Sequence, residues 1–300
     1  MNSNVRPPAV AGSFYPASKD RLLGEIRRCF QDKIIGPGIS ILGNSWRPQT
    51  EKLGNRIECF IVPHAGYAYS GPVAAHSYAL ANQNLISKHE SFVAIILGPN
   101  HQGVGSGIAL SPNDEWETPL GKVNVEKLLS KEIADTSEII DVNSLSHLYE
   151  HSIEVQLPFL QALTSVRGFS FVPICLMLQD RHSSEDVAEA LFKVTQSENH
   201  ASKSFLVLGS SDLTHYELQS KANAQDKKLI DRIEALDLPS YYTTLEKNHI
   251  TACGYGAIAV VMELSRKLGK KKGTLLKYAT SGDVTGDTSS VVGYSAVHFS

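Results

Sequence analysis

The sequence is poor in cysteine and lacks the paired spacing that marks a thiolate cluster. Its four cysteines (Cys29, Cys59, Cys175 and Cys253) lie far apart, without CxxC spacing. In a chain of 300 residues this usage argues against a disulfide scaffold and favours a reduced, cytoplasmic setting. The stretch MNSNVRPPAVAGSFYP has one arginine, two adjacent prolines and no apolar centre, so we do not expect a secretory signal.

Long apolar runs, a basic surplus and nucleotide-binding glycine motifs are also missing. No apolar run approaches the roughly 20 residues that span a bilayer, so we expect no membrane association. Lys plus Arg is 28 against 31 for Asp plus Glu, which argues against a dedicated nucleic-acid-binding protein. Neither GxxxxGK[ST] nor a GxGxxG before a helix occurs, so a dinucleotide cofactor is not expected.

Short apolar runs instead alternate with amphipathic stretches along the chain. The apolar runs predict strands at 57–62, 92–97, 169–176, 205–208, 274–280 and 291–299. The amphipathic stretches predict helices at 19–33, 72–81, 150–163, 185–195, 222–236 and 256–268, with a long loop over 36–55. We therefore predict one α/β domain over 1–300, with a mostly parallel or mixed sheet flanked by helices. No coiled coil or other self-association signature indicates an oligomeric state.

Three of the predicted strands run directly into loops that carry polar residues. The first is followed by His64, the second by His101, and the fourth by Asp212 and His215. Parallel strands would bring these side chains to one edge of the sheet, where sites form in open α/β folds. Imidazoles and a carboxylate suit a first-row divalent metal, and Asp212 and His215 would share a face if their segment turned helically. The plainer interpretation is that each is an ordinary polar loop residue.

Two further segments carry candidate chemistry. In EHSIE, a helix would place His151 and Glu154 on one face, as a metal ligand, an orienting pair or an acid–base pair. The alternative is a salt-linked helix start on the surface. Cys253 stands before the predicted helix 256–268, where a helix N-terminus can lower a thiol pKa. The alternative there is an inert buried cysteine.

Six motifs in order resemble the Memo family. They are RPPAVAGSFYP (6–16), PHAGY (63–67), GPNH (98–101), EHSIE (150–154), SSDLTH (210–215) and CG (253–254). The closing SGDVTGD (281–287) is more similar to archaeal and bacterial members than to animal ones.

The resemblance implies a site as well as a fold. The Memo family is similar in structure to class III extradiol dioxygenases, which are α/β enzymes that bind non-haem iron(II) with two histidines and a carboxylate. By resemblance, His64 and His101 are metal ligands and Cys253 takes the third position. Asp212 and His215 match further pocket residues. A sulfur ligand makes the site softer, which favours copper or a redox-labile iron.

The favoured interpretation is therefore an oxidoreductase with iron(II), or alternatively copper. His215 would act as acid or base, with Asp212 orienting it, and Tyr67 would line the pocket. The alternative is a non-catalytic protein whose pocket binds a small molecule or a peptide. Animal members are linked to phosphotyrosine peptides through an aromatic residue at the rim, and Phe14 and Tyr15 occupy the matching stretch here. A hydrolase using Ser210 or Ser211 is a weaker third idea, because the GxSxG elbow is absent.

Overall fold

The computed structural model describes residues 4–40, 56–164 and 168–300, so most of the predicted loop 36–55 lies outside the described residues. Within these ranges the strands are β1 (Val5–Arg6), β2 (Ile57–Val62), β3 (Phe92–Pro99), β4 (Ile108–Leu110), β5 (Glu115–Thr118), β6 (Gly121–Val125), β7 (Ile140–Val142), β8 (Phe169–Leu176), β9 (Phe205–Ser210), β10 (His215–Glu217), β11 (Gly273–Thr280) and β12 (Val291–Phe299). The α-helices are α1 (Lys19–Gln31), α2 (Tyr67–Ala81), α3 (Lys127–Thr136), α4 (Leu145–Leu148), α5 (Leu157–Leu163), α6 (Arg181–Thr195), α7 (Gln219–Glu234), α8 (Leu238–Asn248), α9 (Tyr255–Lys267) and α10 (Ser281–Thr285).

One large mixed sheet organises the described chain, in the order β1-β5-β6-β8-β3-β9-β2-β12-β10. Its centre, β8-β3-β9-β2, is parallel throughout, while β12 closes it antiparallel to β2 and pairs with β11. The predicted α/β architecture with a mostly parallel or mixed sheet is confirmed. The parallel centre matters for function, because it brings the carboxyl ends of β2, β3 and β9 to one edge.

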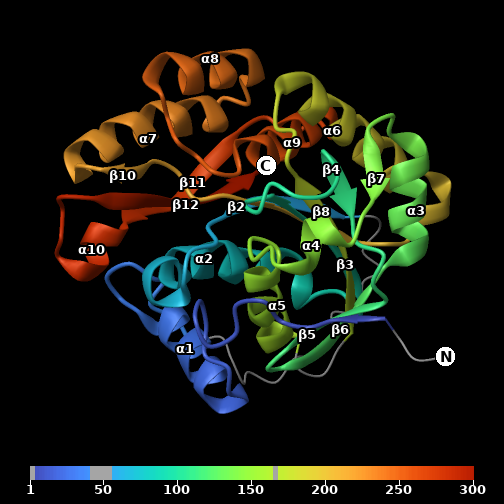
Figure 1. Ribbon diagram of the computed structural model, residues 1–300, viewed down its shortest axis with the longest axis horizontal. Coiled ribbons are helices and arrows are strands. Elements are labelled where there is room, and N and C mark those ends of the chain that lie inside the picture. The colour runs from blue at the N-terminus through green and yellow to red at the C-terminus, as the bar shows by residue number, and fades with distance from the viewer. Residues whose placement is uncertain (1–3, 41–55, 165–167) are drawn as a thin grey trace.

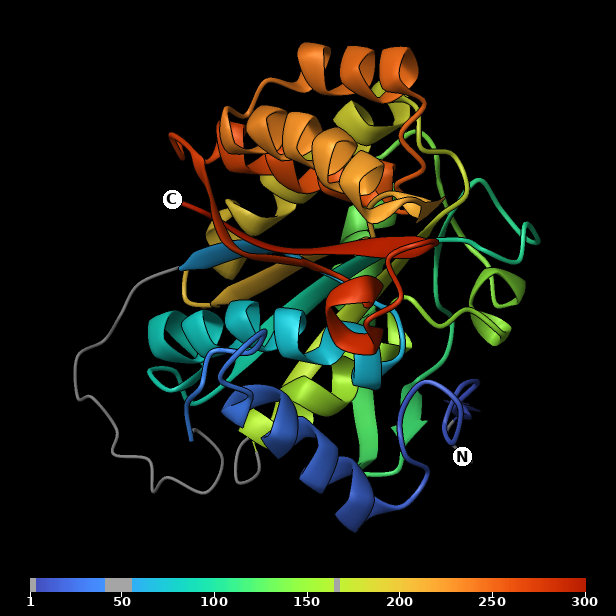
Figure 2. The ribbon, with the colours of Figure 1, turned by 90° about the vertical axis from the view of Figure 1, so that its left-hand side faces the viewer.

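Helices cover both faces of the sheet. The views in Figures 1 and 2 place α6 to α9 on one side and α1, α2 and α5 on the other. The central strands alternate between these layers: in β2, Cys59 and Ile61 belong to one buried cluster, and Phe60 and Val62 to the other. This period of two explains why the strands read as unbroken apolar runs, since both faces of a parallel sheet are buried.

The strand predictions for the buried runs hold closely, whereas two helix predictions need correction. The predicted helix 150–163 begins only with a 3₁₀ turn at Glu154–Gln156, which leads into α5, so residues 150–153 are not helical. Helix α2 starts at Tyr67, before the predicted start at Pro72. Proline removes one helical N–H, and the carbonyl it would have bonded belongs to Ala68, which is exposed to water.

Among the described residues, none of the helices combines the length and the apolar character needed to cross a membrane.

A buried carboxylate on β2 gives a test of the sheet's closing edge. Glu58 accepts hydrogen bonds from Arg56 (2.9 Å) and from His298 of β12 (2.8 Å). Burial alone would raise the pKa of Glu58, but these hydrogen bonds outweigh burial and lower it from 4.5 to about 2. The stabilisation is therefore complete above about pH 4.5 and is lost as the pH falls towards 2.

We expect Glu58→Gln to lower the free energy of unfolding at pH 7 by about 1–3 kcal/mol and to flatten its decline between pH 4.5 and 2. Urea unfolding at several pH values measures both. The control is Glu90→Gln, at an exposed position, which should change neither the free energy of unfolding nor its pH dependence. An unchanged pH profile in Glu58→Gln would refute the assignment.

Candidate metal centre

Strand pairing brings the polar loops together. Val62 at the end of β2 lies beside Ser210 of β9, and Leu97 of β3 lies beside Gly209. The loops that follow these strands therefore start side by side. Asp212 also joins two of them directly, because its Oδ1 accepts the backbone N–H of His64 at 2.8 Å.

Three imidazoles meet at this edge, namely those of His64, His101 and His151. One ring nitrogen of each lies within 4.8 Å of the others. The His101 and His151 rings stack with centroids 4.7 Å apart, and His64 stands edge-on to them at 5.2 and 5.5 Å. His151, for which the sequence left open a role as metal ligand, orienting residue or acid–base partner, thus places its ring within the cluster itself.

The hydrogen bonds of His64 fix its tautomer. Its Nδ1 lies 2.9 Å from the hydroxyl of Ser210. That hydroxyl donates its single proton to the carbonyl of Ser152 (2.8 Å) and also accepts from Gln156 Nε2 (2.9 Å). Ser210 must therefore accept from His64, so Nδ1 carries the proton and Nε2 is unprotonated, with its lone pair towards Cys253. A neutral imidazole with one nitrogen held and the other free is a ready metal ligand.

A buried carboxylate orients His101 in the same way. Glu150 accepts both the backbone N–H (2.6 Å) and the ring Nδ1 (3.0 Å) of His101. It also accepts the backbone N–H groups of His151 and Ser152, each at 2.8 Å. Burial would raise the pKa of Glu150, but His101 and these donors lower it to about 2. The carboxylate is therefore ionised at neutral pH, and it leaves Nε2 of His101 free.

Two of the three imidazoles in the cluster are held in the neutral form. Burial lowers the pKa of His64 well below 6.5, and the neighbouring His151 and His101 lower it further. Burial also lowers the pKa of His151 to about 4. For His101 burial acts in the same direction, but the hydrogen bond and charge of Glu150 outweigh it and raise the pKa. Since protons are disfavoured on two of three converging rings, a bound metal cation is the charge that fits this donor set.

Cys253 lies at the border of the cluster. Its Sγ is 3.1 Å from Nε2 of His64 and accepts the backbone N–H of Asp212 at 3.3 Å. The residue is partly exposed and comes just before Gly254, which caps α9. The sequence suggested a lowered thiol pKa, but burial and then the charge of Asp212 raise the pKa of Cys253. Without a cation, the side chain is therefore a neutral thiol that donates to His64.

Asp212 and His215 do not share a helix face, which corrects that expectation. The segment is an irregular loop that enters β10 at His215. His215 donates from Nδ1 to the carbonyl of Thr251 (2.9 Å), since a carbonyl only accepts, and its Nε2 stays free. Burial raises the pKa of Asp212 to about 6, although the N–H of His64 opposes the shift. Burial therefore favours the protonated form of Asp212 more than water would.

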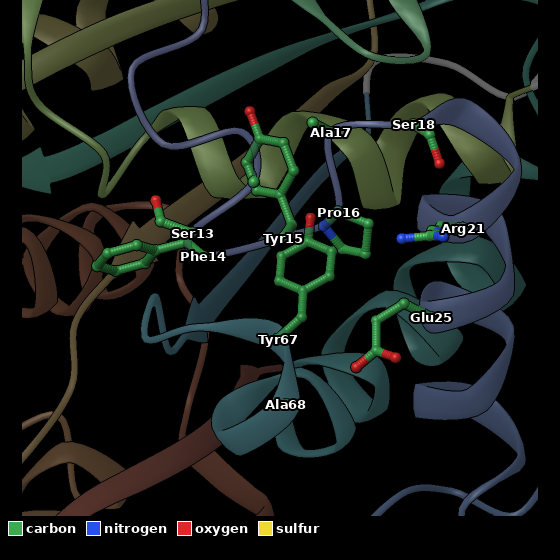
Figure 3. A pocket seen from close by; sticks show the side chains of 11 residues that line it. Ser13, Phe14, Tyr15, Pro16, Ala17, Ser18, Arg21, Glu25, Tyr67 and Ala68 are labelled. Carbon is green, nitrogen blue, oxygen red and sulfur yellow. The ribbon is translucent and has the colours of Figure 1, made fainter.

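The aromatic residues expected at the rim divide into two groups. The Phe14 ring packs on His151 with centroids 4.5 Å apart, so it borders the cluster. Tyr67 is buried and donates to the carbonyl of Val155 at 2.6 Å. Tyr67 and Tyr15 line a pocket of about 700 Å³ beside α1, and Phe14 lines it too, so Phe14 borders both this pocket and the cluster. In Figure 3, the Phe14 ring lies on one side of Tyr15 and Tyr67, and Arg21 and Glu25 lie on the other.

Glu154 faces away from the imidazoles. Its carboxylate accepts from Arg6 Nη1 and the Tyr15 hydroxyl, both at 2.6 Å, and from the backbone N–H groups of Ala9 and Val10. Because residues 150–153 are not helical, the i, i+3 rule that paired Glu154 with His151 does not apply. Glu154 thus ties the N-terminal segment to the turn that carries His151.

Sequence reasoning did not predict the positioning roles of several residues that hold the site together. These are Glu150, Ser210, Gln156 and Arg6. Three of them stand inside motifs already singled out, so the signal was present, but their partners are remote in sequence. The hydroxyls of Ser210 and Ser211 are buried and donate to the carbonyls of Ser152 and Asp212, an arrangement that lends no support to the hydrolase idea.

Comparison with known proteins settles the family. The protein-family model described as Memo-like protein matches residues 6–298 of this chain. The chain belongs to the Memo family. It is 45% identical over 295 residues to a MEMO1 family protein of Nitrosopumilus maritimus, covering 98% of this chain and 99% of that one. A MEMO1 family protein of Saccharolobus solfataricus is 46% identical over 294 residues, with the same coverage.

A solved structure is similar to this Memo protein in fold alone. It is the crystal structure of an uncharacterized protein from Escherichia coli K12, with a TM-score of 0.54 and 9% identity. The match covers 82% of this chain and 100% of the other. At that identity the likeness supports the α/β fold and carries no information about the site.

Proposed function

We propose that this Memo protein binds a first-row divalent metal ion at His64, His101 and His151 and acts as an oxidoreductase. The observation that supports this most is the set of three ring nitrogens within 4.8 Å of one another. Two of these rings have their other nitrogen fixed by Ser210 or Glu150. Iron(II) is the favoured ion and copper the alternative, because imidazole suits both and the nearby sulfur is a soft donor.

Such an ion, when bound, would supply one-electron chemistry and an open position for dioxygen or a small substrate. The chain supplies the rest. Ser210 and Glu150 hold the imidazoles in the tautomers that leave Nε2 free. Asp212 positions the backbone of His64, and His215 offers a free Nε2 for proton transfer.

Metal content tests the proposal directly. We expect protein purified anaerobically, or reloaded with iron(II) or copper, to hold the metal in a stoichiometric amount. His64→Ala, His101→Ala and His151→Ala should each lose it. His182→Ala, a histidine exposed on α6, is the matched control and should keep it. Wild-type protein that refuses both metals would favour the non-catalytic binding protein instead.

Cys253 is proposed as a further donor, because its sulfur lies beside the free nitrogen of His64. We expect Cys253→Ser to weaken metal binding without abolishing it, since the three imidazoles remain. In the copper(II)-loaded protein it should also remove the sulfur-to-metal absorption band. A titration followed by absorption measures both. An unchanged spectrum would place the sulfur outside the coordination sphere.

His215 is proposed as the acid or base. We expect His215→Ala to keep the metal and to slow dioxygen consumption by the iron(II)-loaded protein about 10²–10⁴-fold. Metal analysis of the same sample separates the two effects. Loss of the metal in this variant would make His215 a ligand or a structural residue and would contradict the assigned role.

A further inference from the structure

Tyr216, next to His215, has an unusual backbone conformation. Among the described residues, three that are not glycine have a positive φ, namely Tyr216 (60°), Leu236 (53°) and His249 (51°). Leu236 comes just after α7 and His249 caps the end of α8, where the left-handed conformation is ordinary. Tyr216 instead lies in a strand, where a bulky residue with a positive φ has a strained backbone.

A β-bulge produces this conformation. In the pairing of β10 with β12, His215 lies opposite Val292 and Glu217 opposite Val291. Tyr216 is therefore an extra residue between two consecutive pairs. A bulge bends its strand and re-aims the side chain it carries, and bulges gather beside functional sites.

The re-aimed ring stands near the candidate metal centre and in water. Its centroid is 5.7 Å from that of His215, and the side chain is 79% exposed. His215 itself is held to Thr251, two residues before Cys253, by its backbone N–H (2.8 Å) and its ring Nδ1 (2.9 Å). Tyr216 thus stands at the side of the site formed by His215 and Cys253, whereas Phe14 packs on His151.

We propose that Tyr216 is a specificity-determining residue, whose ring packs on the apolar or flat body of a ligand held by its polar end at the metal. This inference rests on the proposed metal site. An aromatic ring left in water gains most from being covered by another apolar surface. The strained backbone is retained because a relaxed strand would aim the ring to a different side.

The test compares two metal-binding probes that differ by one ring. Imidazole and 4-phenylimidazole are titrated into cobalt(II)-loaded protein, and binding is followed by the visible spectrum of cobalt. We expect the wild type to bind 4-phenylimidazole more tightly. Tyr216→Gly and Tyr216→Asn should lower its affinity about 3–10-fold while binding imidazole as before. Tyr216→Phe, which keeps the ring, should behave as the wild type.

Stability gives a second, independent readout. Glycine is unstrained at positive φ, so Tyr216→Gly should raise the midpoint of thermal unfolding by about 1–3 °C while weakening 4-phenylimidazole binding. His249→Gly is the matched control, because His249 is exposed and has a similar φ but caps the end of α8 and is not part of the imidazole cluster. It should leave the affinity for both probes unchanged.

A failure of the proposed metal site can be distinguished from a failure of the proposed role of Tyr216. Protein that does not take up cobalt(II) contradicts the proposed function, and with it this inference. Normal cobalt(II) loading with an unchanged affinity for 4-phenylimidazole in Tyr216→Gly overturns the role of Tyr216 alone. A fall in imidazole affinity of the same size also overturns it, because the variant would then have disturbed the metal.

Discussion

Glu150→Gln is expected to weaken metal binding about 10–100-fold while the protein stays folded. The carboxylate accepts four hydrogen bonds, two from His101 and one each from the N–H groups of His151 and Ser152. An amide keeps one oxygen but turns an NH₂ group towards donors, so part of this network is lost. The negative charge that makes His101 a stronger ligand is lost as well.

A competition titration of iron(II) or cobalt(II) against a chromophoric chelator measures the change. Glu132→Gln is the matched control, since Glu132 also contacts a histidine, at 2.6 Å from Nε2 of His200, but is half exposed and away from the imidazole cluster. It should change metal affinity less than twofold. Equal effects of the two variants would show that Glu150 has no special part in the site.

Arg6→Met is expected to lower the free energy of unfolding by about 3–5 kcal/mol. Arg6 and Glu154 form an ion pair at 2.6 Å, with side chains only 1% and 0% exposed. The guanidinium also donates to the carbonyls of His147 and Glu150 and lies 4.0 Å over the Trp116 ring. Its removal leaves a buried carboxylate without a counter-charge, which costs more than the pair itself contributes.

Urea unfolding measures this loss, and Arg28→Met is the control. Arg28 pairs with Glu25 on the surface of α1, so its loss should cost about 0–1 kcal/mol. In the double variant Arg6→Met/Glu154→Gln the total loss should be smaller than the sum of the single ones. Additive losses would mean that the two side chains act independently.

The strands and the convergence of the loops could be predicted because they depend on local pattern. β2 and β8 match their predicted ranges, since each is a continuous run of buried apolar residues. Parallel pairing of such strands then brings His64, His101 and Asp212 to one edge without further information. The short strands β4 to β7 were missed because three to five residues carry too little periodicity. Helices α3 and α8 were also missed, although their apolar stripes are as clear as those of helices that were predicted.

Site details were harder because they depend on partners remote in the chain. The pairing of His151 with Glu154 assumed a helix that starts four residues too early. The turn there is stabilised instead by Arg6, almost 150 positions away. The pKa of Cys253 likewise follows burial and Asp212 rather than the helix behind it. No spacing rule contains this information.

The sequence by itself determined the layered α/β architecture, the Memo family motifs and the histidines that reach one edge of the sheet. These follow from periodicity and from residue order, which are local properties. Only the tertiary structure decided that His151 joins His64 and His101, that Glu154 faces Arg6, and that Tyr216 sits on a bulge. The physical reason is that hydrogen bonds, burial and strand register are set by segments that meet only once the chain has folded.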